Sequence, residues 1–440
     1  MPVEVSIPRR RGKGKLKVVE KRNLTQKMLE DLNIDDLDIK AGLIQSLIPL
    51  GLKAVSEELQ KEFKMLVGER YKHGKENTPW GANPGSVYLQ DQKLPVIIPR
   101  VRNRKDNKEV HLSIYKKLQS PYLCDQKTAL KLLNGISMHK YKESAELVPE
   151  VFGLSASNMS KRFKNFAEDS LKNLNARNLS EYDFICIFID GKRYAEDGLL
   201  VAMGVTIEGY KIMLGIEQSH SENSTVINQF FDKLIERGLT YKDGILFIVD
   251  GSKGIIKAIH QRFSEYAFIE RCIWHKEQNV ISYLSKHQQQ VCKIELKRAY
   301  KKTSYKEARQ ALESLYNRLS ITNQSAANSL MEGIDETLTL HKLGLSPELC
   351  KSLNNTNCIE SVMSQLGIYT DKVDRWQSSN QILRWTAAGL LQIEPNLRKI
   401  RGYRYLHLLR FKLKEEIQKR QKEKYGSTEE KEPVEVKTRT

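Results

Sequence analysis

Two aspartates in this sequence each follow an uninterrupted apolar run of strand length. Asp190 comes directly after residues 184–189 and Asp250 directly after residues 245–249, and a glycine follows each. If the two strands are parallel neighbours, their carboxyl ends meet at one edge of a sheet, where open α/β sheets build their sites. Two adjacent carboxylates repel each other unless a divalent cation such as Mg²⁺ or Mn²⁺ neutralises them. The alternative is that each Asp-Gly pair only forms a turn after its strand.

A third carboxylate lies in a segment with helical spacing. Around Glu360, apolar residues at 359, 362, 363 and 366 recur at the period of a helix, and Asn357 shares the other face with Glu360. Such a helix, packed near the sheet, would bring Glu360 to the two aspartates. The competing interpretation is local, with Asn357 as the N-cap and Glu360 as the third residue of a capping-box-like pair.

The segments around these acids alternate between strand and helix patterns. A glycine turn at 208–209 joins the second and third strands. Strands are expected at 184–189, 199–207, 210–216, 245–249 and 267–271, with helices at about 224–237 and 253–264. This order predicts a mixed five-stranded sheet in an α/β fold, in which an antiparallel triplet enters a parallel arrangement. An almost wholly helical stretch is expected at 276–350.

Charge is distributed unevenly along the 440 residues, whose net charge is +18. Residues 1–180 carry 33 basic and 21 acidic side chains, residues 251–440 carry the same numbers, and residues 181–250 carry 6 and 12. The basic flanks favour a polyanionic partner, and bound divalent cations would explain the acidic centre.

Two features of the composition bear on the cellular compartment. No apolar run approaches the roughly 18 residues that cross a bilayer. The six cysteines include no Cys-x2-Cys pair. We therefore expect a cytoplasmic protein that neither contacts a membrane nor contains structural disulfides.

Three arginines in the first third of the chain are candidates for DNA contact. Arg100, Arg102 and Arg104 alternate within and just beyond a strand of a short β hairpin expected at 84–104. A two-residue period puts their guanidinium groups on one face, which could follow a phosphate backbone. A solvated edge strand protected by its charges is the alternative.

A second DNA-binding candidate has the form of a helix-turn-helix at about 144–166. Any helical hairpin can look like this, but a recognition helix there would meet base edges and phosphates from its first two turns. The residues so presented are Ser157, Asn158, Lys161, Arg162 and Lys164. A basic C-terminal helix, residues 397–425 with 11 basic and 3 acidic side chains, could clamp DNA or join a second protomer; a solvated terminal helix is the alternative.

Four motifs in a fixed order resemble the DDE transposases of the Mutator-like family found in bacterial insertion sequences. They are Phe188-Ile-Asp190-Gly, Val249-Asp250-Gly-Ser-Lys-Gly254, Arg271-Cys-Ile-Trp-His275 and Asn357-Cys-Ile-Glu360-Ser. Trp80-Gly-Ala-Asn-Pro-Gly-Ser86 and Arg401-Gly-Tyr-Arg-Tyr-Leu406 extend the resemblance to about residues 80–406.

The resemblance implies an RNase H-like catalytic domain with an all-helical insertion between the second and third acids. It assigns Asp190, Asp250 and Glu360 as the catalytic triad, which would hold two Mg²⁺ ions, or Mn²⁺ in their place, for strand cleavage and strand transfer. The substrate would be double-stranded DNA, namely the terminal inverted repeats of the protein's own mobile element and a target. Synapsis of two ends predicts at least a dimer. The alternatives are an inactive, transposase-derived DNA-binding protein and a nuclease of the same fold without strand transfer.

Cys272 and His275 match the Cys-x2-His signature of that family. We expect His275 to contact a phosphate or organise the acids, and Cys272 to pack as a small apolar residue. Zinc would need four ligands, and the nearest extra donors, His287 and Cys292, have no standard spacing. Trp274 could stack on an unpaired base, but a position in the core is expected.

These observations divide the chain into five expected regions. They are a basic arm at 1–24, a DNA-binding region at 25–180, a catalytic domain at 181–275 and 351–395, a helical insertion at 276–350, and a basic C-terminal helix and tail at 396–440.

Overall fold

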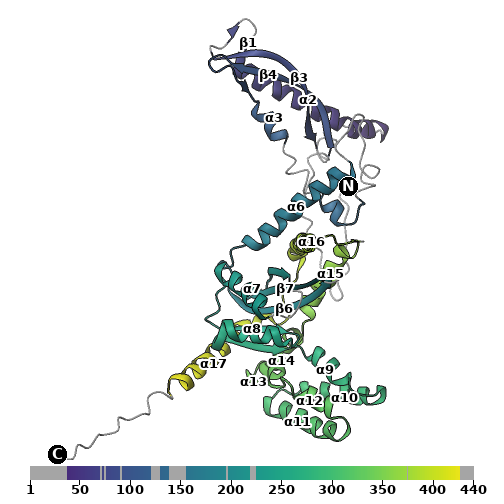
Figure 1. Cartoon of the computed structure of the whole chain (residues 1–440), viewed down its shortest axis with the longest axis vertical. Coiled ribbons are helices and arrows are strands. Elements are labelled where there is room, and N and C mark those ends of the chain that lie inside the picture. The colour runs from purple at the N-terminus through teal and green to yellow at the C-terminus, as the bar shows by residue number, and fades with distance from the viewer. Residues whose placement is uncertain are drawn as a thin grey trace, which may run out of the picture. The chain divides into compact units, whose positions relative to one another are not determined.

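The structure is a computed structural model that describes residues 37–69, 72–73, 76–89, 92–119, 129–137, 155–194, 197–218, 224–373 and 375–426. The chain divides into two compact units, which are described separately (Figure 1). The first contains the described residues up to 119 and Ser155, and the second contains 129–137 and everything described from Ala156 onward. Within these described ranges, no helix has an apolar stretch that could span a bilayer.

In the first unit, a long helix packs on a small antiparallel sheet. Its core is formed by Val55 and Leu59 of the helix with Val87 and Val101 of the sheet. The elements are α2 (Leu37–Val67), β1 (Gly68–Glu69), β2 (Lys72–His73), β3 (Asn77–Leu89), β4 (Gln92–Asn103), β5 (Glu109–Val110) and α3 (Ser113–Leu118). The β3–β4 hairpin is longer than the expected 84–104, because a bulge between Pro79 and Ala82 lets the strand continue through the turn-forming residues.

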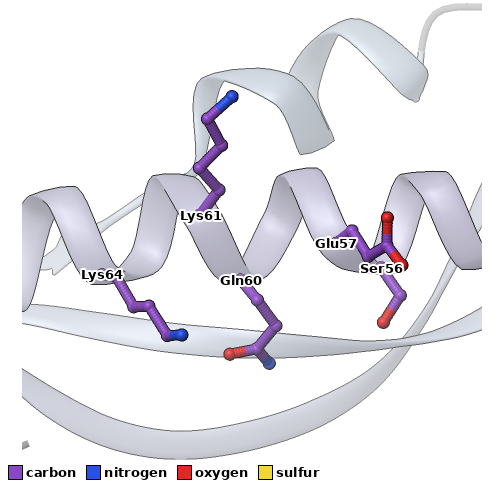
Figure 2. Close-up of a pocket in the computed structure, with 5 residues that line it drawn as sticks. All are labelled: Ser56, Glu57, Gln60, Lys61 and Lys64. Carbon is purple, nitrogen blue, oxygen red and sulfur yellow. The ribbon is translucent and has the colours of Figure 1, made fainter.

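The solvent-facing side of α2 carries a shallow cleft of about 340 Å³. Figure 2 shows the lining residues, with Lys61 directed away from Gln60 and Lys64. They are Ser56, Glu57, Gln60, Lys61 and Lys64, all exposed. This polar face lies opposite the face that buries Leu59, as the helical period of α2 requires.

The second unit is built on the predicted mixed five-stranded sheet. The strands are β6 (Phe184–Tyr194), β7 (Asp197–Thr206), β8 (Lys211–Gln218), β9 (Ile245–Val249) and β10 (Ala267–Arg271), in the spatial order β10-β9-β6-β7-β8. Strands β6, β7 and β8 pair antiparallel, whereas β6, β9 and β10 pair parallel. The predicted antiparallel triplet and parallel extension are thus confirmed.

Helices cover both faces of this sheet (Figure 1). α7 (Ser224–Glu236) and α8 (Lys253–Phe263) pack on the face that contains Ile189. α15 (Asn357–Thr370), α16 (Ser379–Ile393) and α17 (Leu406–Gly426) pack on the face that contains Phe188. Because both faces are covered, the strands read as continuous apolar runs rather than alternating ones.

The stretch 276–350, which lies between the second and third acids, is almost wholly helical, as predicted. They have their own core around Leu296, Leu312 and Leu315, and Figure 1 shows α9 to α12 gathered beside the sheet. The helices are α9 (Ile273–Ile281), α10 (Lys286–Tyr300), α11 (Tyr305–Thr322), α12 (Gln324–Met331), α13 (Thr339–Lys342) and α14 (Ser346–Leu353), with the short 3₁₀ turn η2 (Asp335–Leu338).

Helix α6 (Ala156–Ala176) packs within the second unit. We had expected these residues to belong to the DNA-binding region at 25–180. Its apolar face lies against α16, and the rings of Phe163 and Trp385 have centroids 4.3 Å apart. The first half of the expected helix-turn-helix, residues 144–154, lies outside the described residues.

Candidate active site

Asp190 and Asp250 lie at the same level of adjacent parallel strands. Asp250 directly follows β9, whereas β6 continues past Asp190 to Tyr194 and so extends beyond the predicted strand 184–189. The pairing of β6 with β9 joins Cys186 to Leu246 and Phe188 to Ile248, a constant offset of 60 residues. Asp190 and Asp250 have the same offset, so the continued register places them side by side, with backbones about 4.8 Å apart. Two long apolar strands in this register therefore deliver two carboxylates to one edge of the sheet.

The third neighbouring strand brings Cys272 to this edge. β10 pairs with β9 up to Arg271 and Val249, and the next amide, Cys272 N–H, donates to Val249 O at 2.8 Å. Cys272 is fully buried at the start of α9, and His275 lies one turn further along that helix. β9 and β10 thus end at Asp250 and Cys272, beside Asp190 of β6.

Glu360 reaches the same region from α15. The apolar stripe of this helix is buried in the core beside Phe188, through Ile359, Val362 and Leu366. The burial of this stripe sets the orientation of the helix, and with it the side of the helix from which Glu360 projects. The helix begins at Asn357 with Thr356 as its N-cap, so Glu360 is the fourth helical residue and not the third. The capping-box interpretation is wrong for this reason, since the Glu360 carboxylate accepts a hydrogen bond from the Thr356 hydroxyl instead.

Thr356 also lies in the candidate site, although no sequence pattern singled it out. Its hydroxyl is buried and contacts Glu360 Oε1, Cys272 Sγ at 3.3 Å and His275 Nδ1 at 3.4 Å. A hydroxyl donates only one proton, and a carboxylate is the strongest of the three acceptors. The single Thr356 proton is therefore shared, mostly with the Glu360 carboxylate, and the contact with Cys272 Sγ is likewise a donation to the sulfur.

The electrostatics indicate that the acids lie close together. Burial raises the pKa of Asp190 to about 6, the Gly191 N–H that donates to Asp190 opposes this, and the charges of Asp250 and Glu360 raise it further. A carboxyl group that resists ionisation beside other carboxylates is suited to binding a cation.

The thiol and the imidazole shift each other's pKa. A hydrogen bond to Cys272 raises the pKa of His275 against the effect of burial, and the Glu360 and Asp250 charges add to the rise. Burial acts to raise the pKa of the Cys272 thiol, but hydrogen bonds with His275 and Thr356 outweigh it and lower that pKa. The protonated, positively charged form of His275 is thus favoured at the edge of the acidic cluster.

The donor set of the three acids fits a hard divalent cation, because Mg²⁺ and Mn²⁺ prefer carboxylate oxygens. A second set, Cys272, His275 and Glu360, has ligand atoms within 4.8 Å of one another. Thiolate and imidazole are zinc donors, but here the Thr356 hydroxyl already contacts all three groups. Cys292 is buried in the separate core of the helical stretch and does not extend this set.

The loop after Asp250 is shaped by a glycine and an arginine. Asp250 Oδ1 accepts from Ser252 N–H at 2.9 Å, and Gly251 between them has a φ of +104°. A Cβ at Gly251 would lie 2.0 Å from Nε of Arg271, whose side chain is almost fully buried and donates to Glu332 O. Only glycine fits this position without moving the Arg271 side chain.

Trp274 does not lie in the core, contrary to expectation. Its side chain is 52% exposed and meets the His275 ring edge-on, with centroids 4.8 Å apart. Helix α9 buries Lys276 and Val280 instead, so the exposed side of the helix carries the indole.

The predicted DNA-contact residues fall in both units. In the first, Arg100 and Arg102 both lie over the Trp80 ring, 3.8 and 4.6 Å from its centroid, so they share a face, while Arg104 lies beyond the end of β4. Arg100 also pairs with Glu109 at 2.7 Å.

In the second unit, the predicted recognition residues lie on α6. Arg162 is only 5% exposed, so its guanidinium is not presented to solvent. Lys164 lies 3.9 Å from Glu168. Ser157, Asn158 and Lys161 complete the set on this helix.

Comparison with known proteins identifies related sequences. The family described as "Transposase, Mutator family" matches residues 18–391. The transposase for insertion sequence element IS905 of Lactococcus lactis subsp. lactis (strain IL1403) is 26% identical, and the match covers 52% of this chain and 59% of that relative. The transposase for ISRM5 of Rhizobium meliloti (strain 1021) is also 26% identical, over 63% of this chain and 69% of the relative. That for IS6120 of Mycolicibacterium smegmatis is 26% identical, over 59% and 79%.

Proposed function

Since the chain belongs to the Mutator family of transposases, we propose that it is a DDE-type DNA transposase whose Asp190, Asp250 and Glu360 hold divalent metal ions at the reacting phosphate. The observation that carries the proposal is the common level of Asp190 and Asp250 on paired parallel strands, with Glu360 near enough to raise the pKa of Asp190. A turn role for the two Asp-Gly pairs does not account for the convergence of a third acid from a distant helix.

The catalytic domain is proposed to be RNase H-like. The order of three antiparallel strands followed by two parallel ones supports this, and so does the helical stretch that separates β10 from α15. In this fold the acids occupy the edge where the parallel strands end, and the helical insertion stands beside them.

We assign the residues of the site different roles in phosphoryl transfer. When bound, a pair of Mg²⁺ or Mn²⁺ ions supplies Lewis-acid activation of the attacking oxygen and stabilisation of the leaving oxygen. Asp190 and Asp250 hold the cations from the sheet, and Glu360 holds them from α15. His275, whose pKa is raised, holds a proton and donates it as a hydrogen bond to a phosphate oxygen.

The DNA substrate is proposed to be the terminal inverted repeats of the protein's own element. Arg100, Arg102 and Arg104 supply phosphate contacts from the first unit, and Lys161 and Lys164 supply them from α6. Ser157 and Asn158 would lie at base edges if α6 acts as the second helix of a helix-turn-helix. Synapsis of two ends requires at least a dimer.

The test incubates the full chain with duplexes that carry the element's own ends, in Mg²⁺, and compares wild type with Asp250→Asn. We expect wild type to cleave and join ends and Asp250→Asn to do neither. Asp232→Asn is the matched control, since this half-exposed acid pairs with Arg262 on the surface of α7 and should leave activity unchanged.

Three outcomes contradict the proposal. Equal cleavage by wild type and Asp250→Asn would refute the assignment of the acids. Tight binding of the ends without cleavage by wild type would favour a DNA-binding protein descended from a transposase. Cleavage without joining would favour a nuclease.

A further inference from the structure

The segment that precedes the C-terminal helix α17 and the β7–β8 turn form an exposed surface on the second unit, which we call the C-terminal basic surface. Its residues come from the segment before α17 and from the β7–β8 turn. They are Tyr210, Arg398, Lys399, Arg401, Tyr403 and Arg404, all exposed.

This surface is held in place by the fold. Ile400 is buried, and its N–H donates to Gly209 O in the β7–β8 turn at 3.0 Å. Arg410 of α17 donates to the carbonyls of Gly244 and Phe184, and Arg420 donates to that of Ala267. α17 is thereby attached to the starts of three strands, so the surface is a fixed part of the unit.

The charge of this surface is not balanced. Residues 395–414 contain seven Lys or Arg and no acid. Arg398, Arg401 and Arg404 have no acidic partner among the residues that the structure describes. By contrast, Lys412, Lys414 and Lys419 pair with Glu415, Asp243 and Glu416 further along α17.

Two tyrosine rings fix the position of one ammonium group. Lys399 Nζ lies 4.0 Å from the ring centroid of Tyr210 and 5.1 Å from that of Tyr403. The rings are 52% and 38% exposed, so the charge remains accessible to solvent. Because the ammonium occupies the ring faces, the rings are less suited to stacking on bases, and the surface favours contact with phosphates.

The surface lies at the opposite end of the sheet from the acids. Asp190 pairs with Val201 and Phe184 pairs with Thr206, so the β7–β8 turn is at least six residues along the strands from Asp190. At about 3.3 Å per residue, this is roughly 20 Å. A ligand that contacted both places would have to be an extended polyanion, and B-DNA spans this distance in about six base pairs.

We propose that the C-terminal basic surface binds the phosphate backbone of duplex DNA away from the reacting phosphate. The proposal rests on the proposed function only in taking DNA as the substrate. The contact is independent of sequence, because guanidinium and ammonium groups held over phosphates do not reach base edges. It adds affinity for long duplexes without taking part in the chemistry.

The test measures duplex affinity of the full chain over a range of salt concentrations. One variant carries Arg398→Ala, Arg401→Ala and Arg404→Ala, and a matched control carries Lys412→Ala, Lys414→Ala and Lys419→Ala. Each removes three positive charges. Loss of three phosphate contacts reduces the magnitude of the negative slope of log K against log salt by about 2.7. We expect this decrease in the arginine variant and a much smaller one in the lysine control, whose cations are already paired.

Equal slopes for the two variants would overturn the proposal. So would a loss of self-association in the arginine variant with an unchanged salt slope, since the surface would then be an interface between copies of the chain. Stronger binding of single strands than of duplexes, abolished by Tyr210→Ala, would also overturn it.

A failure of this proposal can be told apart from a failure of the proposed function. Asp250→Asn should bind duplex DNA with the wild-type salt slope, and the arginine variant at saturating concentration should still cleave short end duplexes. If wild type does not cleave, the comparison of slopes still tests the surface.

Discussion

Removal of the Thr356 hydroxyl tests whether the contacts around Glu360 prepare that acid for metal binding. Thr356→Val keeps the branched shape of a fully buried side chain and removes the oxygen that contacts Glu360, Cys272 and His275. Thr356→Ser keeps the oxygen and removes a methyl group. The pair of variants therefore separates the hydrogen bonds from the packing.

The expected size of the effect follows from the charge of the acceptor. A hydrogen bond to a charged group contributes about 1.5–3 kcal/mol, and loss of a group that orients a metal ligand lowers metal affinity about 10- to 100-fold. We expect Thr356→Val to raise the Mg²⁺ concentration for half-maximal end cleavage by about that factor. The rate at saturating Mg²⁺ should fall much less, because the ligand itself is still present.

The assay is end cleavage over a Mg²⁺ titration, with thermal unfolding measured for each variant. Thr356→Ser should titrate close to wild type. A role of the Thr356 hydroxyl in metal binding is refuted if Thr356→Val has the wild-type Mg²⁺ curve while Glu360→Gln is inactive. It is also refuted if Thr356→Ser and Thr356→Val shift the curve equally, because the methyl packing would then be the cause.

Three further predictions concern the loop, a buried lysine and the hairpin. Gly251→Ala should destabilise the protein by about 1–3 kcal/mol more than Gly344→Ala in thermal unfolding. Both glycines have a positive φ, but of the two only Gly251 faces the Arg271 side chain. Equal losses of stability in the two variants would contradict this prediction. Lys276 is buried, and burial together with Arg271 lowers its pKa to about 8, below the 10.5 of an exposed lysine. Between these two pH values the unfolded chain binds more protons than the folded protein. The free energy of unfolding should therefore rise by up to about 3 kcal/mol from pH 8 to pH 10.5. Lys276→Met should lack this rise in pH-dependent urea unfolding, and an unchanged rise would show that other groups cause it. Trp80→Ala should weaken binding to the element's ends by about tenfold in a binding titration, because Arg100 and Arg102 lose the ring that positions them. Lys105→Ala removes a cation that does not contact this ring, so it should have little effect on binding.

The sheet and the positions of Asp190 and Asp250 on it could be predicted because their signals are local. An apolar run that ends in Asp-Gly specifies both a strand and the position of its carboxylate, and the shared 60-residue offset then follows from pairing those runs in register. The apolar stripe of α15 likewise fixed the face that carries Glu360.

Other features depend on contacts between distant segments. Thr356 lies in a loop with no periodicity, and its partners Cys272 and His275 are more than 80 residues away. The place of α6 depends on Trp385 of α16, and the exposure of Trp274 depends on the burial of Lys276, whose ammonium is satisfied by the carbonyl of Ser329. Neither partner is visible in the pattern around α6 or α9.

The binding of metal by the three acids is tested most simply by a crystal structure of the protein with Mn²⁺, which is located by its anomalous scattering. We predict two peaks about 3.5–4 Å apart among the carboxylates of Asp190, Asp250 and Glu360. A single peak bound by Cys272 and His275, or no peak at the three acids at saturating Mn²⁺, would contradict this prediction.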